Sequence, residues 1–328
     1  MSRRATRGTA RAALAVALLL LGPRAASAQD FSDVFFFGDS LTDTGLFCAG
    51  LGALGQGYAS GSCSNGDVWA DVLAEALGVS LDAGEENFAN GGDTTSDLDT
   101  QIDLFEASLL FQDADPDALY VVWLGSNDVL ALPSGPLAME NAVGRIVAGI
   151  EALADLGAEQ FLVANLVDVG RAWGHFNFDF PEVKGEIFTP EERVRVTELS
   201  TEFNALLHQA LGTLSGVTVH ELDVHGLLED VFAAPTSFGF PPTAIDTTTD
   251  ATDFGIPCLE DAACASSPQG AIADDFILFD ALHPTTAAHA IIGEEAVRLL
   301  LPEPGALLGH ALAVLAAAAL ARIWRQSP

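Results

Sequence analysis

The sequence VFFFGDSLTDTG at residues 34–45 joins a short apolar run to a polar turn. The apolar run, residues 34–37, has the length and the side chains of a strand that is buried on both faces. Strands of this kind are typical of parallel sheets that helices cover on both sides, and such sheets bind ligands at the carboxyl ends of their strands. The polar turn, which contains Ser40, therefore stands where a binding or catalytic site is expected.

Elsewhere along the chain, apolar runs alternate with segments that have the apolar period of a helix. The further predicted strands are residues 87–90, 119–124, 161–165 and 217–222. The predicted helices are residues 68–77, 139–156, 190–211 and 285–300. Alternating strands and helices predict an α/β fold, in which a five-stranded parallel sheet lies between two layers of helices.

Residues 233–273 interrupt this alternation. They are rich in proline, threonine, aspartate and glycine and show little periodicity, which predicts either a functional insertion or a loose surface loop. A calcium site on Asp246, Asp250 and Asp253 is the less favoured alternative. The preferred prediction for the whole chain contains no metal site.

The charge and the composition of the chain exclude several classes of protein. The 328 residues include 13 Lys and Arg against 46 Asp and Glu, a formal charge of −33, and 49% are hydrophobic. A chain so apolar is not disordered, and one so acidic would be repelled by a nucleic-acid backbone. The length allows one large domain or two, either with a sizeable core.

The N-terminal segment, residues 1–28, has the pattern of a secretory signal peptide. It carries five arginines and no acid, and its apolar run at 12–21 is followed by Ala-Ser-Ala at 26–28. This order of a basic start, an apolar run and small residues predicts cleavage after Ala28. An N-terminal membrane helix is disfavoured because the apolar run is too short to span a bilayer.

The C-terminal segment, residues 302–328, has the pattern of a membrane-spanning sorting tail. Residues 305–321 are almost all Ala, Leu and Val, the tripeptide PEP precedes them, and two arginines follow. Such a segment predicts a transmembrane helix with a cytoplasmic end, although a buried helix of a soluble protein is the alternative. The segment resembles the PEP-CTERM tails of Gram-negative bacteria. That resemblance implies transient anchoring in the inner membrane, removal by a sortase-like protease, and a periplasmic, cell-surface or extracellular protein.

Between these segments, residues 29–301 form the predicted folded body. It keeps six basic and 45 acidic residues, a formal charge near −39. An even number of cysteines in an exported chain favours disulfides. Of the three possible connectivities, the local pairs Cys48–Cys63 and Cys258–Cys264 are favoured because each closes a short loop. A zinc site is disfavoured because the spacings do not suit one.

Four short polar blocks contain the candidate functional residues. They are FGDSL at 37–41, GG at 91–92, GSND at 125–128 and DALHP at 280–284. In this order and spacing the blocks resemble those of the GDSL, or SGNH, hydrolases, a family of serine esterases and lipases. The extended first block looks most like the branch that holds plant-type GDSL lipases and bacterial outer-surface esterases. The resemblance implies a flavodoxin-like, three-layer α/β/α hydrolase domain over residues 29–301.

Ester cleavage needs the residue types that these blocks supply. A serine hydroxyl is a poor nucleophile until a base takes its proton, and His283 follows Asp280 at a spacing that lets the carboxylate orient the ring. The resemblance implies that Ser40 is the nucleophile of a triad with these two residues. It also implies an oxyanion hole, made by the backbone amides of Ser40 and Gly92 and by the Asn127 side chain.

We therefore expect an exported serine hydrolase that cleaves carboxylic esters through an acyl-enzyme on Ser40, without a cofactor or a metal. Its substrate would be a small-molecule, lipid or glycan ester, and no nucleic acid is expected to bind. Two alternatives stay open. The protein could be an O-acetyl esterase that acts on extracellular polysaccharide, or a non-catalytic surface binding protein on a hydrolase scaffold.

Overall fold

The computed structural model describes residues 31–53, 57–59, 61–172, 188–246 and 253–301. By its contacts the chain separates into two units, residues 30–299 and the terminal segments 1–29 and 300–328. The predicted signal peptide and sorting tail lie outside the described residues, so only the first unit is treated below. No helix within the described ranges is both long and apolar enough to cross a membrane.

A parallel sheet forms the centre of this unit. Its strands are β1 (Val34–Gly38), β2 (Leu119–Trp123), β3 (Gln160–Ala164) and β4 (Thr218–Leu222), in the spatial order β1-β2-β3-β4. Each strand pairs in parallel with the next, and the register places Val34 opposite Leu119 and Leu119 opposite Gln160. The predicted α/β fold with a parallel sheet is confirmed.

The prediction of a fifth strand at residues 87–90 is wrong, because the sheet has four strands within the described residues. The segment forms only an isolated parallel bridge, between Phe36 of β1 and Asn87. The Phe88 amide still donates to the Phe36 carbonyl, at 2.8 Å. The Asn87 side chain, however, accepts from the Ala89 amide at 3.0 Å. A side chain that bonds its own backbone two residues on bends the chain into a turn, which competes with strand pairing.

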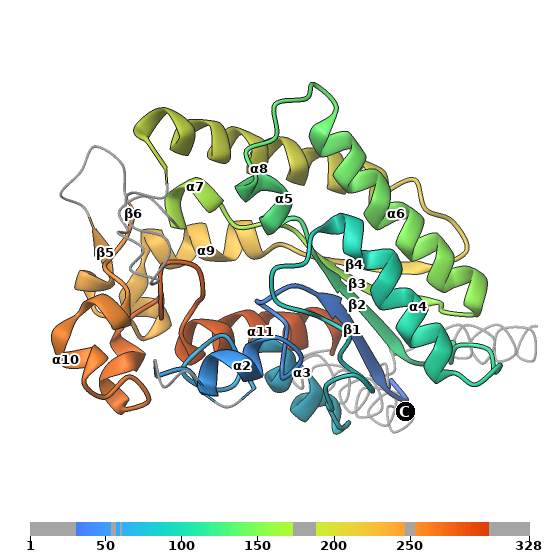
Figure 1. Ribbon diagram of the computed structural model, residues 1–328, viewed down its shortest axis with the longest axis horizontal. Coiled ribbons are helices and arrows are strands. Elements are labelled where there is room, and N and C mark those ends of the chain that lie inside the picture. The colour runs from blue at the N-terminus through green and yellow to red at the C-terminus, as the bar shows by residue number, and fades with distance from the viewer. Residues whose placement is uncertain (1–30, 54–56, 60, 173–187, 247–252, 302–328) are drawn as a thin grey trace, which may run out of the picture. The chain divides into compact units, whose positions relative to one another are not determined.

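Helices cover both faces of the sheet (Figure 1). On one face lie α4 (Leu98–Ser108), α6 (Ala138–Leu156) and α8 (Pro190–Leu211), and on the other lie α3 (Trp69–Leu77) and α11 (Thr286–Leu300). Successive side chains of a strand point to opposite faces. Thus Phe35 packs on Phe105 of α4, with ring centroids 4.9 Å apart, and Phe36 packs on Trp69 of α3 at 5.7 Å.

The four predicted helices are present as α3, α6, α8 and α11, each with ends at the expected residue or one residue away. Helix α8 begins with the capping box that its sequence indicates. The Thr189 hydroxyl accepts from the Glu192 amide at 3.2 Å, and the Glu192 carboxylate accepts from the Thr189 amide at 2.8 Å. Helix α4 and the ten-residue helix α9 (Val224–Ala233) are the longer helices that the apolar pattern did not predict.

The other elements are short. They are α2 (Cys48–Ala53), α5 (Ser126–Leu130), α7 (Val169–Ala172), α9 (Val224–Ala233), α10 (Ala262–Ala265), the 3-10 turns η1 (Thr95–Asp97), η2 (Pro235–Phe238), η3 (Pro242–Ala244), η4 (Cys258–Glu260) and η5 (Ala271–Asp275), and the antiparallel pair β5 (Ile245–Asp246) and β6 (Asp253–Phe254). Several of these elements fill the irregular stretch 233–273, which buries Phe240 and both of its cysteines.

Both predicted local disulfides are present. Cys48 and Cys63 are joined with their Cα atoms 5.0 Å apart, and Cys258 and Cys264 with theirs 5.1 Å apart. The alternative calcium site is placed on side chains that lie outside the described part of the chain.

Candidate active site

The polar turn after β1 presents Ser40 at the carboxyl end of that strand. Its shape is set by Asp39, because the Leu41 amide donates to the Asp39 side chain at 3.0 Å and the amides of Thr42 and Asp43 donate to the Asp39 carbonyl at 3.0 Å. Local bonds of this kind hold a tight turn. Ser40 is thereby fixed on the strand end, where parallel sheets bind ligands.

Asp43 holds the next part of the loop through backbone contacts alone. Its carboxylate accepts from the amides of Gly45, Leu46, Phe47 and Cys48, at 2.8 to 3.1 Å, and from the amide of Gly91 at 2.9 Å. The side chain is fully buried, and these bonds satisfy a carboxylate in such a place. Asp43 therefore ties the nucleophile block to the glycine block.

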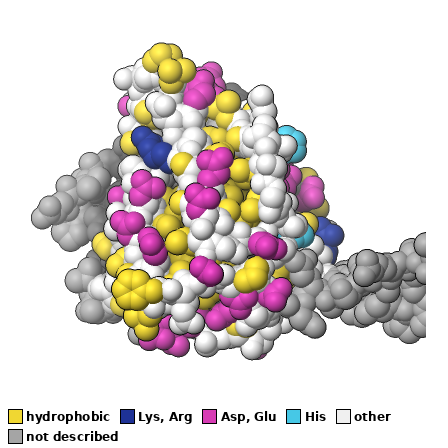
Figure 2. Space-filling view, turned by 90° about the vertical axis from the view of Figure 1, so that its right-hand side faces the viewer, with side chains coloured by type: hydrophobic (Ala, Val, Ile, Leu, Met, Phe, Trp, Pro, Cys, Tyr) yellow, Lys and Arg dark blue, Asp and Glu magenta, His cyan; other side chains and the backbone are white. Residues whose placement is uncertain are grey.

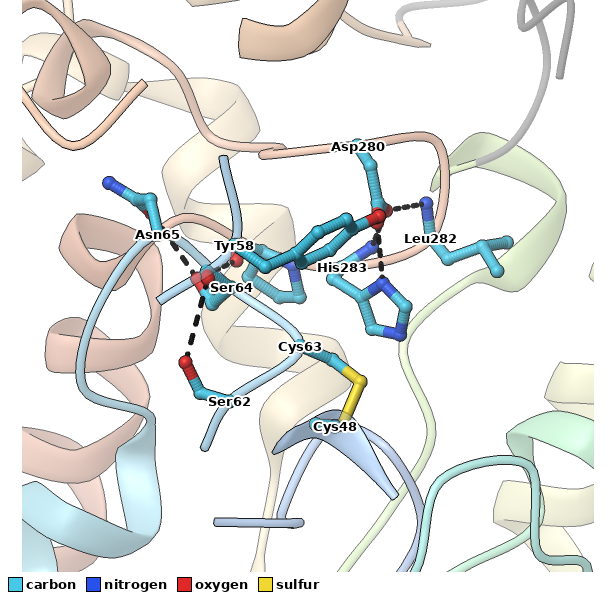
Figure 3. A network of polar contacts seen from close by, with 10 residues as sticks. Cys48, Tyr58, Ser62, Cys63, Ser64, Asn65, Asp280, Leu282 and His283 are labelled. Atoms are coloured by element: carbon cyan, nitrogen blue, oxygen red, sulfur yellow. Dashed lines mark hydrogen bonds and ion pairs between the residues drawn. A yellow bond between two sulfur atoms is a disulfide. The ribbon is translucent and has the colours of Figure 1, made fainter. Parts of the chain in front are cut away.

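Asp280 and His283 form a buried pair in the loop before α11. Asp280 Oδ2 lies 2.8 Å from His283 Nδ1, and Asp280 Oδ1 accepts from the backbone amides of His283 and Leu282 at 2.7 and 2.6 Å. Figure 3 shows the other ring nitrogen of His283 pointing away from Asp280. The carboxylate thus fixes the tautomer and the direction of the ring, which leaves Nε2 as the nitrogen that can accept a proton.

The pKa of Asp280 is lowered and the pKa of His283 is raised by their contact. Burial would raise the pKa of Asp280, but the charge of His283 and the hydrogen bonds to the carboxylate outweigh it and hold that pKa below its usual value. Burial would lower the pKa of His283, but its attraction and hydrogen bond to Asp280, with a further contribution from Asp39, raise it instead. An ionised carboxylate beside a basic imidazole is the charge state that a general base needs.

The loop that carries Gly92 is bonded to the end of β2. Gly92 has a φ of +88°, which favours glycine. The Asn127 side-chain amide, in α5 directly after β2, donates to the Asp93 carbonyl at 2.8 Å. Asp128 accepts from the Thr95 amide at 2.8 Å and from its hydroxyl at 2.7 Å. The glycine block and the asparagine block are therefore held side by side.

An apolar cavity opens beside these blocks. Ser40 and Asn127 line it, together with Leu282 and Pro284, the two chain neighbours of His283. The apolar side chains that line the rest of it include Leu130, Val167, Val169, Leu228, Ile277 and Ile292. The structure thus gathers residues from three of the four predicted blocks around one cavity, and the Gly92 block is bonded to that group through Asn127.

Two residues that support the site were not singled out in the sequence. Gln101 of α4 is buried and accepts from the Gly38 amide at 2.9 Å, while its amide group donates to the Gly38 carbonyl and to Asp93, each at 2.8 Å. Tyr58 donates to Asp280 at 2.5 Å. Gln101 could have been noticed in the sequence as a polar residue on the apolar face of a helix. Nothing in the sequence around Tyr58 indicated that it bonds Asp280.

Asp39 has an unusual environment for an acid. It is 1% exposed, and its Oδ2 atom has no hydrogen-bond partner among the described residues. Burial raises the pKa of Asp39 to about 7, with small opposing contributions from the Leu41 amide and His283 and supporting ones from Asp128 and Asp93. Asp39 is one of the residues that line the cavity beside Ser40, and its charge raises the pKa of His283.

Comparison with known proteins gives a consistent family. The family model described as GDSL-like Lipase/Acylhydrolase matches residues 34–296. That range includes all four blocks from which the site is built.

Several curated proteins are similar over most of the chain. A GDSL esterase/lipase of Arabidopsis thaliana is 25% identical, over 68% of this chain and 74% of that protein. The thermolabile hemolysin of Vibrio parahaemolyticus is 26% identical, over 81% of this chain but 63% of the hemolysin, so the chain spans less than two thirds of that relative. A phosphatidylcholine-sterol acyltransferase of Aeromonas hydrophila is 25% identical, over 82% of this chain and 90% of the relative. A crystal structure of a lipolytic G-D-S-L family member from Veillonella parvula covers 81% of this chain and 97% of its own, with a TM-score of 0.42 and 14% identity.

Proposed function

Because the chain belongs to the GDSL-like lipase and acylhydrolase family and is an ester-cleaving hydrolase, we propose that it works through an acyl-enzyme on Ser40. The observation that carries this proposal is the buried Asp280–His283 pair, whose chain neighbours line the same cavity as Ser40. A base that a carboxylate orients is what a serine hydroxyl needs to become a nucleophile.

In the first half of the proposed reaction, Ser40 Oγ attacks the ester carbonyl carbon and its proton passes to His283 Nε2. The carbonyl oxygen becomes an oxyanion, and we assign its stabilisation to the amides of Ser40 and Gly92 and to the side chain of Asn127. The Asn127 amide group has two N–H bonds, and its bond to Asp93 uses one of them. Collapse of the intermediate breaks the bond to the alcohol, which leaves with the proton from His283.

In the second half, water attacks the acyl carbon and gives one proton to His283. The ester bond to Ser40 then breaks, His283 returns the proton to Ser40 Oγ, and the carboxylic acid leaves. Asp280 stays ionised throughout and stabilises the imidazolium that forms twice in each cycle. These steps need no cofactor.

The lining of the cavity supports an ester with an apolar acyl chain. Its aliphatic side chains suit several methylene groups, and each buried methylene contributes about 0.8 kcal/mol. An acetyl group would leave most of that surface uncovered, so the apolar lining favours a lipid-type ester over an O-acetylated polysaccharide. The name of the Aeromonas relative, a phosphatidylcholine-sterol acyltransferase, is consistent with a phospholipid as acyl donor.

We also propose that the protein is exported. The support is the signal-peptide pattern of residues 1–28 and the PEP-CTERM-like pattern of residues 302–328. Intact-mass measurement of the protein recovered outside the inner membrane tests this. A chain that begins after Ala28 and ends near the PEP tripeptide is expected, and a mass that includes both segments would contradict it.

The proposed nucleophile is tested by Ser40→Ala, with Ser108→Ala as its matched control. Ser108 lies at the end of α4 and bonds only to the Phe105 carbonyl in the described structure, at 2.6 Å. Ser40→Ala is expected to lower hydrolysis of p-nitrophenyl octanoate by about 10³-fold or more and to abolish labelling by a fluorophosphonate. Ser108→Ala should keep both. Turnover that persists in the folded Ser40→Ala protein would overturn the proposal, and a wild type that fluorophosphonate does not label would favour the binding-protein alternative.

A further inference from the structure

We propose that Tyr58 is a positioning residue that holds Asp280, and through it His283, in the orientation needed for catalysis; this inference rests on the proposed function of that pair. Tyr58 Oη donates to Asp280 Oδ2 at 2.5 Å, and His283 Nδ1 lies 2.8 Å from the same oxygen. The tyrosine comes from a loop 222 residues earlier in the chain. Among the described residues no hydrogen bond joins Tyr58 to Ser40 or His283, so its polar effect on the pair passes through Asp280.

The tyrosine completes the set of donors around the Asp280 carboxylate. Oδ1 is held by the backbone amides of Leu282 and His283, within the same turn. Oδ2 would be held by His283 alone if the phenol were absent. Among the described residues, Tyr58 therefore supplies the one side-chain hydrogen bond to Asp280 from another part of the chain, and it sets the plane of the carboxylate independently of the histidine that the carboxylate must orient (Figure 3).

The ring of Tyr58 is itself fixed. The residue is 5% exposed, and its ring meets Phe279 edge to face with centroids 5.1 Å apart. Both residues belong to one buried cluster with Ala273 and the Cys258–Cys264 disulfide. A ring with this environment cannot swing away from Asp280 without opening an apolar core, so the phenol is preorganised for its bond.

The loop that carries Tyr58 is docked on the loop that carries the pair. The Ser64 hydroxyl donates to the Pro284 carbonyl at 2.7 Å, and the Thr286 amide donates to the Asn65 side chain at 2.9 Å. The Cys48–Cys63 disulfide closes the Tyr58 loop at its base. Within the described residues, three hydrogen bonds join the two loops. Of these, only the Tyr58 bond ends on the carboxylate that orients His283 (Figure 3).

The electrostatic setting supports a donor role. Burial and the neighbouring Asp280 charge raise the pKa of Tyr58 far above its usual value, so the phenol keeps its proton at any working pH. The ionisable groups that face His283 are Asp280, Asp39 and His289. Burial lowers the pKa of His289 to about 3, so it stays neutral. A substitution of Tyr58 is therefore expected to change the pKa of His283 through Asp280.

Tyr58→Phe tests the inference, with Tyr120→Phe as a matched control. These are the only tyrosines in the chain, and Tyr120 is also buried with its hydroxyl bonded, to the Asp115 carbonyl at 3.0 Å. Tyr58→Phe is expected to lower kcat about tenfold or more, the scale of a lost bond to a charged group, and to change KM less than twofold. Without the phenol, Asp280 holds the imidazolium more strongly, so the acidic limb of kcat/KM should move to higher pH.

Tyr120→Phe should change neither kcat nor the acidic limb. If Tyr58→Phe folds, as judged by near-ultraviolet circular dichroism, and matches Tyr120→Phe in both measurements, the inference is wrong and Tyr58 only fills space. The proposed function is tested separately by Ser40→Ala. Its failure would show as turnover without Ser40, whereas failure of the present inference leaves turnover dependent on Ser40 and insensitive to the Tyr58 hydroxyl.

A second measurement does not depend on how well Tyr58→Phe folds. In the Tyr120→Phe background, growth on 3-fluorotyrosine places a single fluorine label on Tyr58. Its ¹⁹F resonance is expected to titrate with the same midpoint as the acidic limb of kcat/KM, because protonation of His283 changes the charge that the phenol meets. A resonance that stays constant across that limb would contradict the inference.

Discussion

Asp39 precedes the proposed nucleophile and has a carboxylate oxygen without a partner among the described residues. Its burial raises the pKa to about 7, and the charge that remains above that pH lies close to the imidazole of His283. A buried carboxyl with this pKa costs stability when it ionises, and such costs are typical of groups that a reaction uses. The residue therefore links the stability of the fold to the pH at which the site works.

The pH dependence of stability should change in Asp39→Asn. The folded-state pKa of about 7 lies above the ordinary value of 3.8. The folded protein thus binds this proton more tightly than the unfolded chain does. Its stabilising contribution is complete below pH 3.8 and is lost as the pH rises through 7. Relative to wild type, Asp39→Asn is expected to gain on the order of 2 kcal/mol between pH 5 and pH 8.

The measurement is urea unfolding of both proteins at pH 5 and at pH 8. Comparing the two pH values removes the constant cost of placing an amide in that site. Asp97→Asn is a suitable control, because Asp97 caps η1 through the Thr94 amide and does not line the cavity. Equal loss of stability with pH in wild type and Asp39→Asn would contradict the prediction.

Apart from the residues that the family resemblance supplied, the sequence revealed the pairings whose partners lie close in the chain. Asp280 and His283 are three positions apart, so their pairing is visible as a spacing. Tyr58 reaches the same carboxylate from 222 positions away. Gln101 reaches Gly38 from 63 positions away. Neither contact leaves a local pattern in the sequence. The letters around a buried tyrosine or glutamine do not show which residue its hydroxyl or amide group is bonded to.

At the scale of the element, the apolar period predicted α3, α6, α8 and α11 but missed α4 and α9. The buried face of α4 is made by Leu98, Gln101, Ile102 and Phe105. One of these four is polar because it bonds β1 and the Gly92 loop, so the site itself interrupts the apolar stripe. The prediction of a fifth strand was wrong for a related reason, because the Asn87 side chain is hydrogen-bonded to the loops of the site. Its amide group donates to the Thr42 carbonyl at 2.7 Å.

The two disulfides should differ in their effect on activity more than on stability. In the chain-entropy picture, closing the 15-residue separation of Cys48–Cys63 stabilises by about 3 kcal/mol, and the 6-residue separation of Cys258–Cys264 by about 2 kcal/mol. Only the first closes the loop that carries Tyr58. We expect the Cys48→Ala, Cys63→Ala double variant to lose most of its kcat at a temperature where it remains folded.

The Cys258→Ala, Cys264→Ala double variant provides the comparison, since this disulfide belongs to the same buried cluster as Tyr58 but does not close its loop. It should keep more of the wild-type kcat, because the contacts of Ser64 and Asn65 still dock the loop. Thermal unfolding and kcat are measured on the same samples. Two variants with equal kcat and equal stability would show that loop closure does not matter to the site.

At the scale of the whole molecule, the parallel sheet explains how residues from distant blocks meet. Ser40 follows β1 and Asn127 follows β2, and these strands are neighbours in the sheet. Strands that run in parallel place their carboxyl ends on one edge, so two blocks 87 positions apart become adjacent once the sheet forms. The parallel sheet was readable from the alternation of strands and helices, but the order of its strands was not predicted. The support around the edge was not, because it comes from loops and one polar helix face.

The surface charge is a property of the molecule and not of the site. The chain has a formal charge of −33, and Figure 2 shows one face on which acidic side chains are scattered among apolar and neutral ones, with few basic side chains. Some of the basic residues are already paired, as Arg145 is with Asp128 at 3.7 Å and Arg195 with Glu198 at 3.3 Å. Most acids on such a surface meet other acids, and this repulsion lowers the stability of the compact state.

Salt should therefore stabilise the protein. The distance over which charges interact falls from about 30 Å at 10 mM salt to a few ångströms near 1 M, so screening removes repulsion that only the folded state concentrates. Raising NaCl from 10 mM to 0.5 M at pH 7.5 is expected to raise Tm by roughly 3–6 °C, which corresponds to about 1–2 kcal/mol for a chain of this size. At about pH 4.1, the sequence isoelectric point, enough carboxylates are protonated to bring the net charge close to zero, and the same salt step should raise Tm by much less. A rise of equal size at both pH values would instead indicate a general effect of salt on apolar burial, and a constant Tm at pH 7.5 would show that the acidic surface costs the fold nothing.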